Sequence, residues 1–358
     1  MEHPTWHNVH PDFSLNGIPS AFENLFEIGY SLIKEGEPFE KPIGDFLVDW
    51  ASKKPTLEVA TSGSTGKPKT IVLQKEHMVN SALATGEFFQ LKPNQKALLC
   101  LPCTGIAGKM MLVRAMVLGL QLDYVEPSSS PLPENNKVYD FVAMVPLQVQ
   151  NSLSQLSTRV KTLIVGGAPV EAGLRSKLKT LSTQTFETYG MTETITHVAL
   201  KRIDRESSGY FEALPNVSIA QDERGCLVID APKISNERIV TNDMVELAGN
   251  TQFEWMGRYD SIINSGGIKL VPESIEEKLS NLIKSRFFVA GMPDETLGQK
   301  LVLVVEGNAT EVQKLLQSIK NIKTLSKYEV PKEVYFVNSF VETVTKKIDR
   351  RKTIQQIN

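Results

Sequence analysis

Apolar and polar positions along the first half of the chain follow two alternating patterns. Short apolar runs of strand length are separated by longer stretches whose apolar positions recur at helical spacing. The expected strands are residues 70–73, 97–101, 141–145, 161–165 and 185–187, and the expected helices are residues 75–89, 109–120 and 170–181. This alternation is typical of a mainly parallel sheet with helices on its faces, so we predict an α/β fold.

The pattern changes from about residue 209. Shorter apolar segments follow there, which predicts a β-rich subdomain at residues 217–220, 226–230 and 237–240. Beyond the segment Gly257-Arg258-Tyr259-Asp260-Ser261, strands again alternate with helices, expected at residues 273–285 and 310–319. We therefore predict a large N-terminal domain over residues 1–259 and a small C-terminal α+β domain over residues 260–358.

The expected helix at residues 109–120 is apolar on every face except at Arg114. A helix of this kind is buried, so the guanidinium must have a partner, because an isolated buried charge is very costly. The partner is either a structural Asp or Glu, which is the commoner case, or the carboxylate of a bound ligand. The sequence leaves both open.

Residues 61–69 (Thr-Ser-Gly-Ser-Thr-Gly-Lys-Pro-Lys) fit neither a core nor a helix and therefore form a loop. Glycine lets backbone N–H groups converge on an anion, hydroxyls add donors, and lysine adds charge, so we call this segment the phosphate cradle. A flexible linker is the weaker interpretation, because a linker needs neither the lysine pair nor the proline. The spacing excludes a P-loop, since Lys67 is followed by Pro68.

Two of the expected strands, residues 161–165 and 185–187, run directly into glycine-bearing loops. These are Gly166-Gly167-Ala168-Pro169 and Tyr189-Gly190-Met191-Thr192-Glu193-Thr194. Ligands of open α/β sheets gather at the carboxyl ends of the strands, so both loops are candidates for one binding site.

Composition points to a small-molecule partner. The 39 basic residues nearly balance the 41 acidic ones, so no overall field favours nucleic acid or an anionic membrane. Three cysteines give no disulfide framework and suit a reducing cytosol, and we expect Cys100-x-x-Cys103 to be buried thiols rather than a metal or redox pair. With no leader pattern and no apolar run of spanning length, we expect a cytoplasmic protein without membrane insertion.

Taken in order, these pieces resemble the adenylate-forming superfamily of acyl-CoA synthetases. The resemblance runs from about residue 57 to residue 352. It rests on the phosphate cradle, Tyr189-Gly-Met-Thr-Glu193, Asp243, Gly257-Arg258-x-Asp260 with Ser265-Gly266-Gly267, and a basic C-terminal lysine. It implies that a small-molecule carboxylate attacks the α-phosphate of ATP to give acyl-AMP and pyrophosphate, after which the thiol of coenzyme A attacks the acyl carbonyl.

The resemblance also implies roles for single residues. Thr192 would contact phosphate and take part in catalysis, and Glu193 would bind Mg²⁺ as a hard oxygen donor. Asp260 would be the hinge of a mobile C-terminal lid, and Gly266 and Gly267 would serve the CoA step. The ATP-binding residues would be Thr61, Ser62, Gly63, Ser64, Thr65, Gly66, Lys69, Gly166, Gly167, Ala168, Tyr189, Gly190, Asp243 and Arg258.

Two adjacent lysines, Lys346 and Lys347, are candidates for the catalytic lysine. The family pattern Gly-Lys-x-x-Arg corresponds here to Lys346-Lys347-Ile348-Asp349-Arg350. Lys347 has arginine three residues further on, whereas Lys346 has Asp349, so we choose Lys347 as the residue that bridges the carboxylate and the α-phosphate. If the basic cluster around Lys347 does not bind phosphate, it is a solvated tail.

The segment from Leu101 to Gly108, followed by Arg114, is similar to the corresponding region of the o-succinylbenzoate-CoA ligases of menaquinone synthesis. That substrate carries two carboxylates, so Arg114 would hold the aromatic one while the succinyl carboxylate is activated. Thr196 and His197 would line the same pocket. Gly105 replaces the usual histidine, and the region before the phosphate cradle is about half the customary length or less, which suggests a trimmed N-terminal subdomain.

Three other functions stay open on sequence alone. They are another aryl- or acyl-CoA ligase, an adenylation domain that loads a carrier protein, and a degenerate nucleotide-binding protein without activity. The joint presence of Glu193, Asp243, Arg258 and Lys347 argues against the last. The oligomeric state also stays open, and a homo-oligomer is compatible with the sequence.

Overall fold

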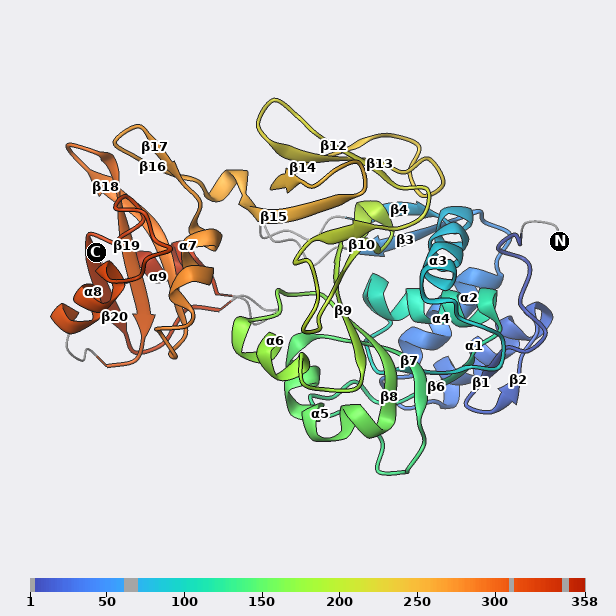
Figure 1. Ribbon diagram of the computed structural model, residues 1–358. Helices are drawn as coiled ribbons and strands as arrows, with labels where there is room; N and C mark the ends of the chain where they lie inside the picture. The colour runs from blue at the N-terminus through green and yellow to red at the C-terminus, as the bar shows by residue number, and fades with distance from the viewer. Residues whose placement is uncertain (1–3, 61–69, 309–311, 343–347, 358) are drawn as a thin grey trace. The chain divides into compact units, whose positions relative to one another are not determined.

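The computed structural model describes residues 4–60, 70–308, 312–342 and 348–357 (Figure 1). The chain divides into two compact units. Unit 1 comprises Met1–Ala220, Val228–Ile239 and Leu247–Phe253, and unit 2 comprises Gln221–Leu227, Val240–Glu246 and Glu254–Asn358. The domain boundary after residue 259 stays a prediction.

A parallel sheet forms the centre of unit 1, as predicted. Its neighbouring strands run in the order β6, β5, β7, β8 and β9, and every pair among them is parallel. At the outer edge, β1 (Ser14–Leu15) is parallel to β6 and antiparallel to β2 (Ile18–Pro19). The central strands are β5 (Lys96–Leu99), β6 (Gln121–Tyr124), β7 (Tyr139–Met144), β8 (Val160–Val165) and β9 (Gln184–Gly190).

Helices cover both faces of this sheet. Successive side chains of a strand point to opposite faces, so Phe141 and Val142 of β7 show which helices lie on each face. On β7, Val142 packs with α5 (Pro146–Arg159) and α6 (Ala172–Leu178). The preceding residue, Phe141, points to the opposite face, where the centroid of its ring lies 5.4 Å from that of Phe89 in α3 (Lys75–Phe89). The prediction of helices on both faces is confirmed, although α5 had no prediction of its own.

Helix α4 (Ile106–Leu118) is buried along nearly its whole length, as its apolar pattern predicted. It packs against α3. The chain before these helices contains α1 (Leu25–Glu35), α2 (Lys41–Ala51) and the 3-10 turn η1 (Phe22–Asn24). The antiparallel pair β3 (Thr56–Ala60) and β4 (Thr70–Gln74) flanks the phosphate cradle, which itself lies outside the described residues.

Beyond β9 the pairing becomes antiparallel, which confirms the change of pattern near residue 209. Strand β10 (His197–Arg202) pairs with β9, β11 (Phe211–Ala213) with β10, and β15 (Gln252–Arg258) with β11. The remaining strands of this part are β12 (Ser218–Gln221), β13 (Cys226–Asp230) and β14 (Ile239–Leu247).

Unit 2 contains the predicted α+β arrangement. A mixed sheet has the order β17, β16, β19 and β18, and β20 is parallel to β19. Its strands are β16 (Ile263–Ser265), β17 (Ile268–Leu270), β18 (Phe287–Asp294), β19 (Gly298–Glu306) and β20 (Glu333–Val337). Its helices are the 3-10 turn η3 (Tyr259–Ser261), α7 (Pro272–Leu279), α8 (Val312–Lys320) and α9 (Arg350–Ile354).

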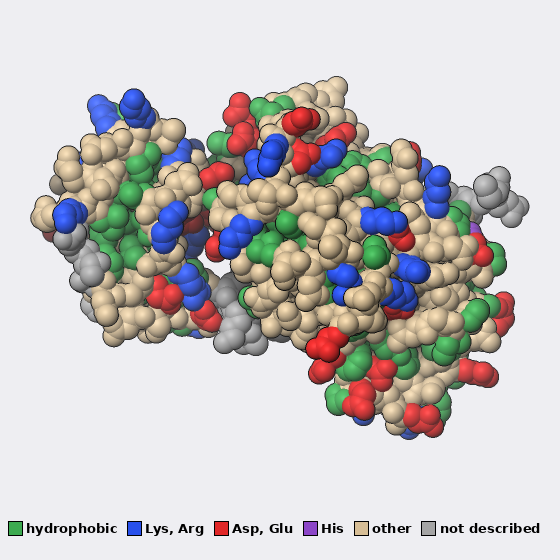
Figure 2. Space-filling view, turned by 60° about the horizontal axis from the view of Figure 1, so that its bottom comes forward, with side chains coloured by type: hydrophobic (Ala, Val, Ile, Leu, Met, Phe, Trp, Pro, Cys, Tyr) green, Lys and Arg blue, Asp and Glu red, His purple; other side chains and the backbone are tan. Residues whose placement is uncertain are grey.

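Charges of both signs are interspersed on the face shown in Figure 2, in keeping with the balanced composition. Among the described residues, no helix combines the length and the apolar character that crossing a membrane requires.

Candidate active site

The loops after β8 and β9 meet at one edge of the unit 1 sheet, because these strands are parallel neighbours. Gly166 lies so close to β9 that an added Cβ would be 2.2 Å from Oγ1 of Thr188, and Gly167 has a positive φ of 80°. A larger residue at Gly166 would displace the Thr188 side chain. The structure therefore brings Gly166, Gly167 and Ala168 together with the strand that carries Tyr189.

Glu187 fixes this loop and was missed by sequence reasoning. One carboxylate oxygen accepts a hydrogen bond from the backbone N–H of Val170, and the other pairs with Arg175 at 2.8 Å and Lys201 at 3.2 Å. Burial raises the pKa of Glu187, but Lys201 and Arg175 outweigh burial and hold it below its usual value. An acidic residue in a buried strand was the only signal available in the sequence.

The hairpin between β9 and β10 presents Thr192 and Glu193 on the 3-10 turn η2 (Thr192–Thr194). Thr194 is buried, accepts a hydrogen bond from the Met191 N–H and donates to the Thr196 carbonyl oxygen. Ile195 has φ 64° and ψ −60°, and the Thr196 N–H donates to the Thr194 carbonyl at 2.7 Å, which makes a strained γ-turn. This tight turn leaves Glu193 exposed at its tip.

Tyr189 packs edge-on against two stacked phenylalanines of unit 1. Its ring lies 5.2 Å from that of Phe253 and 5.8 Å from that of Phe211. The tyrosine is half-buried, so its ring presents a fixed, partly accessible surface beside the loop at Gly166.

Arg114 is the most deeply buried charge near this hairpin, with 1% of its surface exposed. Its Nε donates to Thr85 Oγ1 at 3.3 Å, and its Nη2 reaches Thr196 Oγ1 and His197 Nδ1, both at 3.4 Å. Nη1 points to the sulfur of Met111 at 3.8 Å. Within the described part of the chain, no carboxylate pairs with this guanidinium, and burial lowers its pKa to about 9. The structure thus brings together Arg114, Thr196 and His197.

The hydrogen bonds of His197 define its protonation state. Arginine can only donate hydrogen bonds, so Nδ1 of His197 accepts one from Arg114. The ring proton is therefore on Nε2, which donates to Thr85 Oγ1 at 3.3 Å. Burial, and then the nearby guanidinium, lowers the pKa of His197 well below its usual value. The imidazole is therefore neutral at physiological pH.

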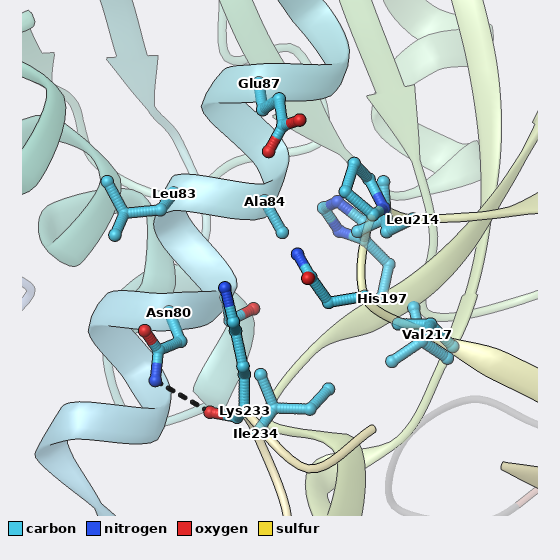
Figure 3. A pocket seen from close by; sticks show the side chains of 13 residues that line it. Asn80, Leu83, Ala84, Glu87, His197, Leu214, Val217, Lys233 and Ile234 are labelled. Carbon is cyan, nitrogen blue, oxygen red and sulfur yellow. Dashed lines mark hydrogen bonds between the residues drawn. The ribbon is translucent and has the colours of Figure 1, made fainter. Parts of the chain in front are cut away.

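A cavity of about 210 Å³ adjoins this cluster (Figure 3). One face of α3 forms one wall, and β10 with the loops after β11 and β13 forms the other. The labelled side chains of Glu87 and Lys233 enter it from different sides, and the Asn80 amide donates to the Lys233 carbonyl at 2.8 Å. The lining residues are Asn80, Ser81, Leu83, Ala84, Glu87, His197, Val198, Leu214, Pro215, Asn216, Val217, Lys233 and Ile234. Arg114 is not among them, although its Nη2 contacts His197, which is.

Unit 2 contains three further expected residues, Asp243, Arg258 and Asp260. Asp243 is 8% exposed, and its Oδ1 accepts a hydrogen bond from the indole N–H of Trp255 at 3.1 Å. The Arg258 guanidinium forms a two-pronged pair with Asp260, with both N···O distances at 2.9 Å. Hydrogen bonding to Arg258 holds the pKa of Asp260 below its usual value. Sequence reasoning assigned Arg258 and Asp260 separate roles and did not foresee this pairing.

The remaining expectations fall partly outside the described residues. Gly266 and Gly267 have φ values of 58° and 83° in the turn between β16 and β17. Lys347 and the phosphate cradle (Thr61, Ser62, Gly63, Ser64, Thr65, Gly66 and Lys69) lie outside that part of the chain.

Close to Lys347 in sequence, Arg350 pairs with Glu276 of α7 at 2.8 Å. Burial raises the pKa of Glu276 to about 7, although Arg350 opposes this shift. The pair fixes the start of α9 to α7 within unit 2.

The described residues hold no cluster of three or more histidine, cysteine or carboxylate side chains that could bind a metal. The exposed carboxylate of Glu193 fits Mg²⁺, which is commonly held by one or two carboxylates together with phosphates and water. Burial raises the pKa of Cys100 and Cys103 to about 12, which agrees with inert thiols.

Comparisons with known proteins agree with these observations. The family described as AMP-binding enzyme matches residues 59–230. A 2-succinylbenzoate--CoA ligase of Listeria monocytogenes is 25% identical, over 94% of this chain and 77% of the relative.

Two solved structures extend the comparison. An acyl-CoA synthetase (AMP-forming)/AMP-acid ligase II-like protein of Dyadobacter fermentans is 38% identical, with a TM-score of 0.61 over 93% of this chain and 98% of that one. The o-succinylbenzoate CoA synthetase of Bacillus subtilis, in complex with its acyl-adenylate intermediate, shares the fold at 17% identity. Its TM-score is 0.70 over 92% of this chain and 80% of the other.

Proposed function

The chain belongs to the family of AMP-binding enzymes and is an AMP-forming acyl-CoA ligase, and on this premise we propose that its acyl substrate is 2-succinylbenzoate (o-succinylbenzoate). The observation that carries the proposal is the buried Arg114, which neutral side chains surround and which no described carboxylate pairs with. A substrate with a second carboxylate provides a counter-charge. Several relatives bear the name of that ligase, which supports the same assignment.

In the first step, the succinyl carboxylate attacks the α-phosphate of ATP, and pyrophosphate leaves. Negative charge develops on the phosphate oxygens, so preorganised donors accelerate the step. Thr192 is half-buried on the tight η2 turn and would donate a hydrogen bond to a phosphate. The phosphate cradle supplies N–H groups, hydroxyls and Lys69 to the leaving pyrophosphate, and Lys347 bridges the carboxylate and the α-phosphate.

Mg²⁺, when bound, neutralises charge on the phosphates. Glu193 is the residue that would hold it, because its carboxylate is exposed beside Thr192. The loop at Gly166, Gly167 and Ala168 and the ring of Tyr189 would bind the adenine, since the glycines allow a flat group to approach the backbone closely.

The ribose would be bound by Asp243 and Arg258. Trp255 donates a hydrogen bond to Asp243 and so orients the carboxylate that would accept a hydrogen bond from a ribose hydroxyl. Asp260 pairs with Arg258, and a rotation of the chain at Asp260 would alter that pair. This coupling supports Asp260 as the hinge between the two steps.

In the second step, the thiol of coenzyme A attacks the acyl carbonyl and AMP leaves. The turn at Gly266 and Gly267 has positive φ angles and no side chains, so a pantetheine arm could pass close to its backbone. The enzyme would act in the cytoplasm and would catalyse one step of menaquinone synthesis.

The test is product formation from a panel of carboxylic acids with ATP and Mg²⁺, with and without coenzyme A. The proposal requires AMP, pyrophosphate and a CoA thioester, with 2-succinylbenzoate as the best acid. ADP and phosphate as products, or a better aryl or aliphatic monoacid, would contradict it. Transfer to a carrier protein but not to coenzyme A would favour a carrier-loading adenylation domain.

A further inference from the structure

Arg224 lies in the turn between β12 and β13, and Asp222 fixes this turn. One carboxylate oxygen of Asp222 accepts hydrogen bonds from the backbone N–H groups of Arg224 and Cys226, both at 2.9 Å. The other oxygen accepts from Arg224 Nε at 2.8 Å and pairs with Nη2 at 2.7 Å. The backbone and the side chain of Arg224 are therefore held by the same aspartate.

The guanidinium of Arg224 also joins this turn to β14. Its Nη1 donates to Asn242 Oδ1 at 2.9 Å, and its Nη2 donates to the carbonyl oxygen of Thr241 at 3.0 Å. These two partners lie 18 and 17 residues further along the chain, so they are not part of the turn itself. They come directly before Asp243, which is one of the two residues that we assign to the ribose.

Thr241 connects these contacts to Asp243. Its hydroxyl donates to the Leu227 carbonyl at 2.8 Å and accepts the backbone N–H of Asp243 at 3.0 Å. Its carbonyl oxygen is the one that Arg224 binds. Arg224 and Leu227 together therefore fix the backbone that carries the buried carboxylate of Asp243.

Arg224 also contacts the chain beside Arg258, the second residue assigned to the ribose. Its guanidinium carbon lies 5.3 Å from the centroid of the Tyr259 ring, within the range of a cation–π contact. Tyr259 stands between Arg258 and Asp260, whose side chains pair with each other. A planar guanidinium can stack on a ring and donate in fixed directions at the same time, which a lysine ammonium cannot do. Arg224 therefore holds a neighbour of each ribose-binding residue.

We propose that Arg224 is a positioning residue for the ribose of the nucleotide. It holds Asn242 on β14 and Tyr259 on η3, and so fixes the spacing of the two ribose-binding side chains that follow and precede them. It thereby determines the preference for ATP over a deoxyribonucleotide without itself touching the nucleotide. The inference rests on the proposed function, because that function assigns Asp243 and Arg258 to the ribose.

The test is kcat/KM for ATP relative to 2′-deoxy-ATP and 3′-deoxy-ATP, measured as pyrophosphate release with the best acid of the panel. The wild type should prefer ATP to at least one deoxynucleotide by about 10- to 100-fold, as expected for a hydroxyl bonded to a charged group. Arg224→Met should lower kcat/KM for ATP by about tenfold and for that deoxynucleotide by less than about twofold, so most of the preference is lost. Both nucleotides are measured on one preparation, so any loss of folded protein cancels from the ratio.

The matched control is Arg238→Met, the same change at an arginine that pairs with a nearby aspartate, Asp230, at 2.9 Å. Among the described residues, no contact joins Arg238 to Asn242 or Tyr259, so the preference for ATP should stay as in the wild type.

A second pair of variants tests the contact with the ring. Tyr259→Phe keeps an aromatic face for Arg224 and should keep the preference for ATP. Tyr259→Leu loses that face and should lower the preference by about threefold, the value of one exposed cation–π contact.

A preference for ATP that survives in Arg224→Met, or that falls equally in Arg238→Met, would overturn the inference and leave the proposed function intact. Equal use of all three nucleotides by the wild type would overturn the inference together with the assignment of Asp243 and Arg258 to the ribose. A wild type that releases no pyrophosphate with any acid would refute the proposed function and this inference with it.

Discussion

The Nη2 atom of Arg114 lies 3.4 Å from Nδ1 of His197, which joins a buried cation to a neutral ring. Among the described residues, the guanidinium also contacts the hydroxyls of Thr85 and Thr196 and the sulfur of Met111. These acceptors are uncharged, so they satisfy N–H groups of Arg114 without neutralising its positive charge. The uncancelled charge is the basis of the proposal that the substrate carries a second carboxylate.

Acid should destabilise the protein through His197. Its pKa is lowered in the folded state, so below about pH 6.5 the unfolded state binds the proton first and stability is lost as pH falls toward the folded pKa. The free energy of unfolding should then fall by up to about 1.4 kcal/mol per pH unit. His197→Gln should remove this part of the pH dependence in denaturant titrations. The same slope in wild type and His197→Gln would contradict this account.

Gly190→Ala should damage the reacting loop. The new methyl group would meet the Thr196 carbonyl at 2.2 Å, so β9 and β10 must separate. We expect a loss of about 2–4 kcal/mol in the free energy of unfolding, together with loss of adenylation. Gly173→Ala is the matched control, because beyond its chain neighbours and its own helix backbone no described atom lies within 4 Å of its added Cβ. Equal stability of the two variants would refute the close contact.

Trp255→Phe should weaken ATP binding without affecting the acyl acid. The variant loses the indole donor at 3.1 Å from Asp243 Oδ1, so the carboxylate is no longer fixed. KM for ATP should rise about five- to tenfold, as expected for one lost hydrogen bond to a charged group, with kcat and KM for the acid nearly unchanged. A parallel rise in KM for the acid would indicate a general structural effect instead.

Lys347→Ala should abolish adenylation while sparing thioester formation from supplied acyl-AMP. The reason is that the lysine would stabilise charge only while the carboxylate attacks ATP. Lys346→Ala is the neighbouring control and should retain both half-reactions. Equal loss of both half-reactions in Lys347→Ala, or the stronger defect in Lys346→Ala, would contradict the assignment.

The hydrophobic periodicity of the sequence predicted helices and strands whose apolar positions recur at regular local spacing. The helix at residues 75–89 matches α3, and the apolar stretch around Arg114 is the buried helix α4. The parallel strands β7, β8 and β9 lie within a few residues of their expected positions. Glycine-bearing loops after strands also indicated where β8 and β9 end.

Contacts between distant segments could not be predicted in this way. Arg114 meets Thr196 and His197, which lie 82 and 83 residues further along the chain. No local pattern encodes that meeting, nor the positive φ of Ile195, which its β-branched side chain disfavours.

The central claim is that Arg114 recognises the second carboxylate of the substrate. The most direct measurement is kcat/KM for 2-succinylbenzoate relative to 3-benzoylpropanoate, which lacks the aromatic carboxylate, in wild type and in Arg114→Met. The wild type should prefer the diacid by about a hundredfold, the value of one charge-assisted contact of about 3 kcal/mol, and the variant should lose that preference while remaining folded. A wild-type ratio near one, or a preference that survives in Arg114→Met, would contradict the account.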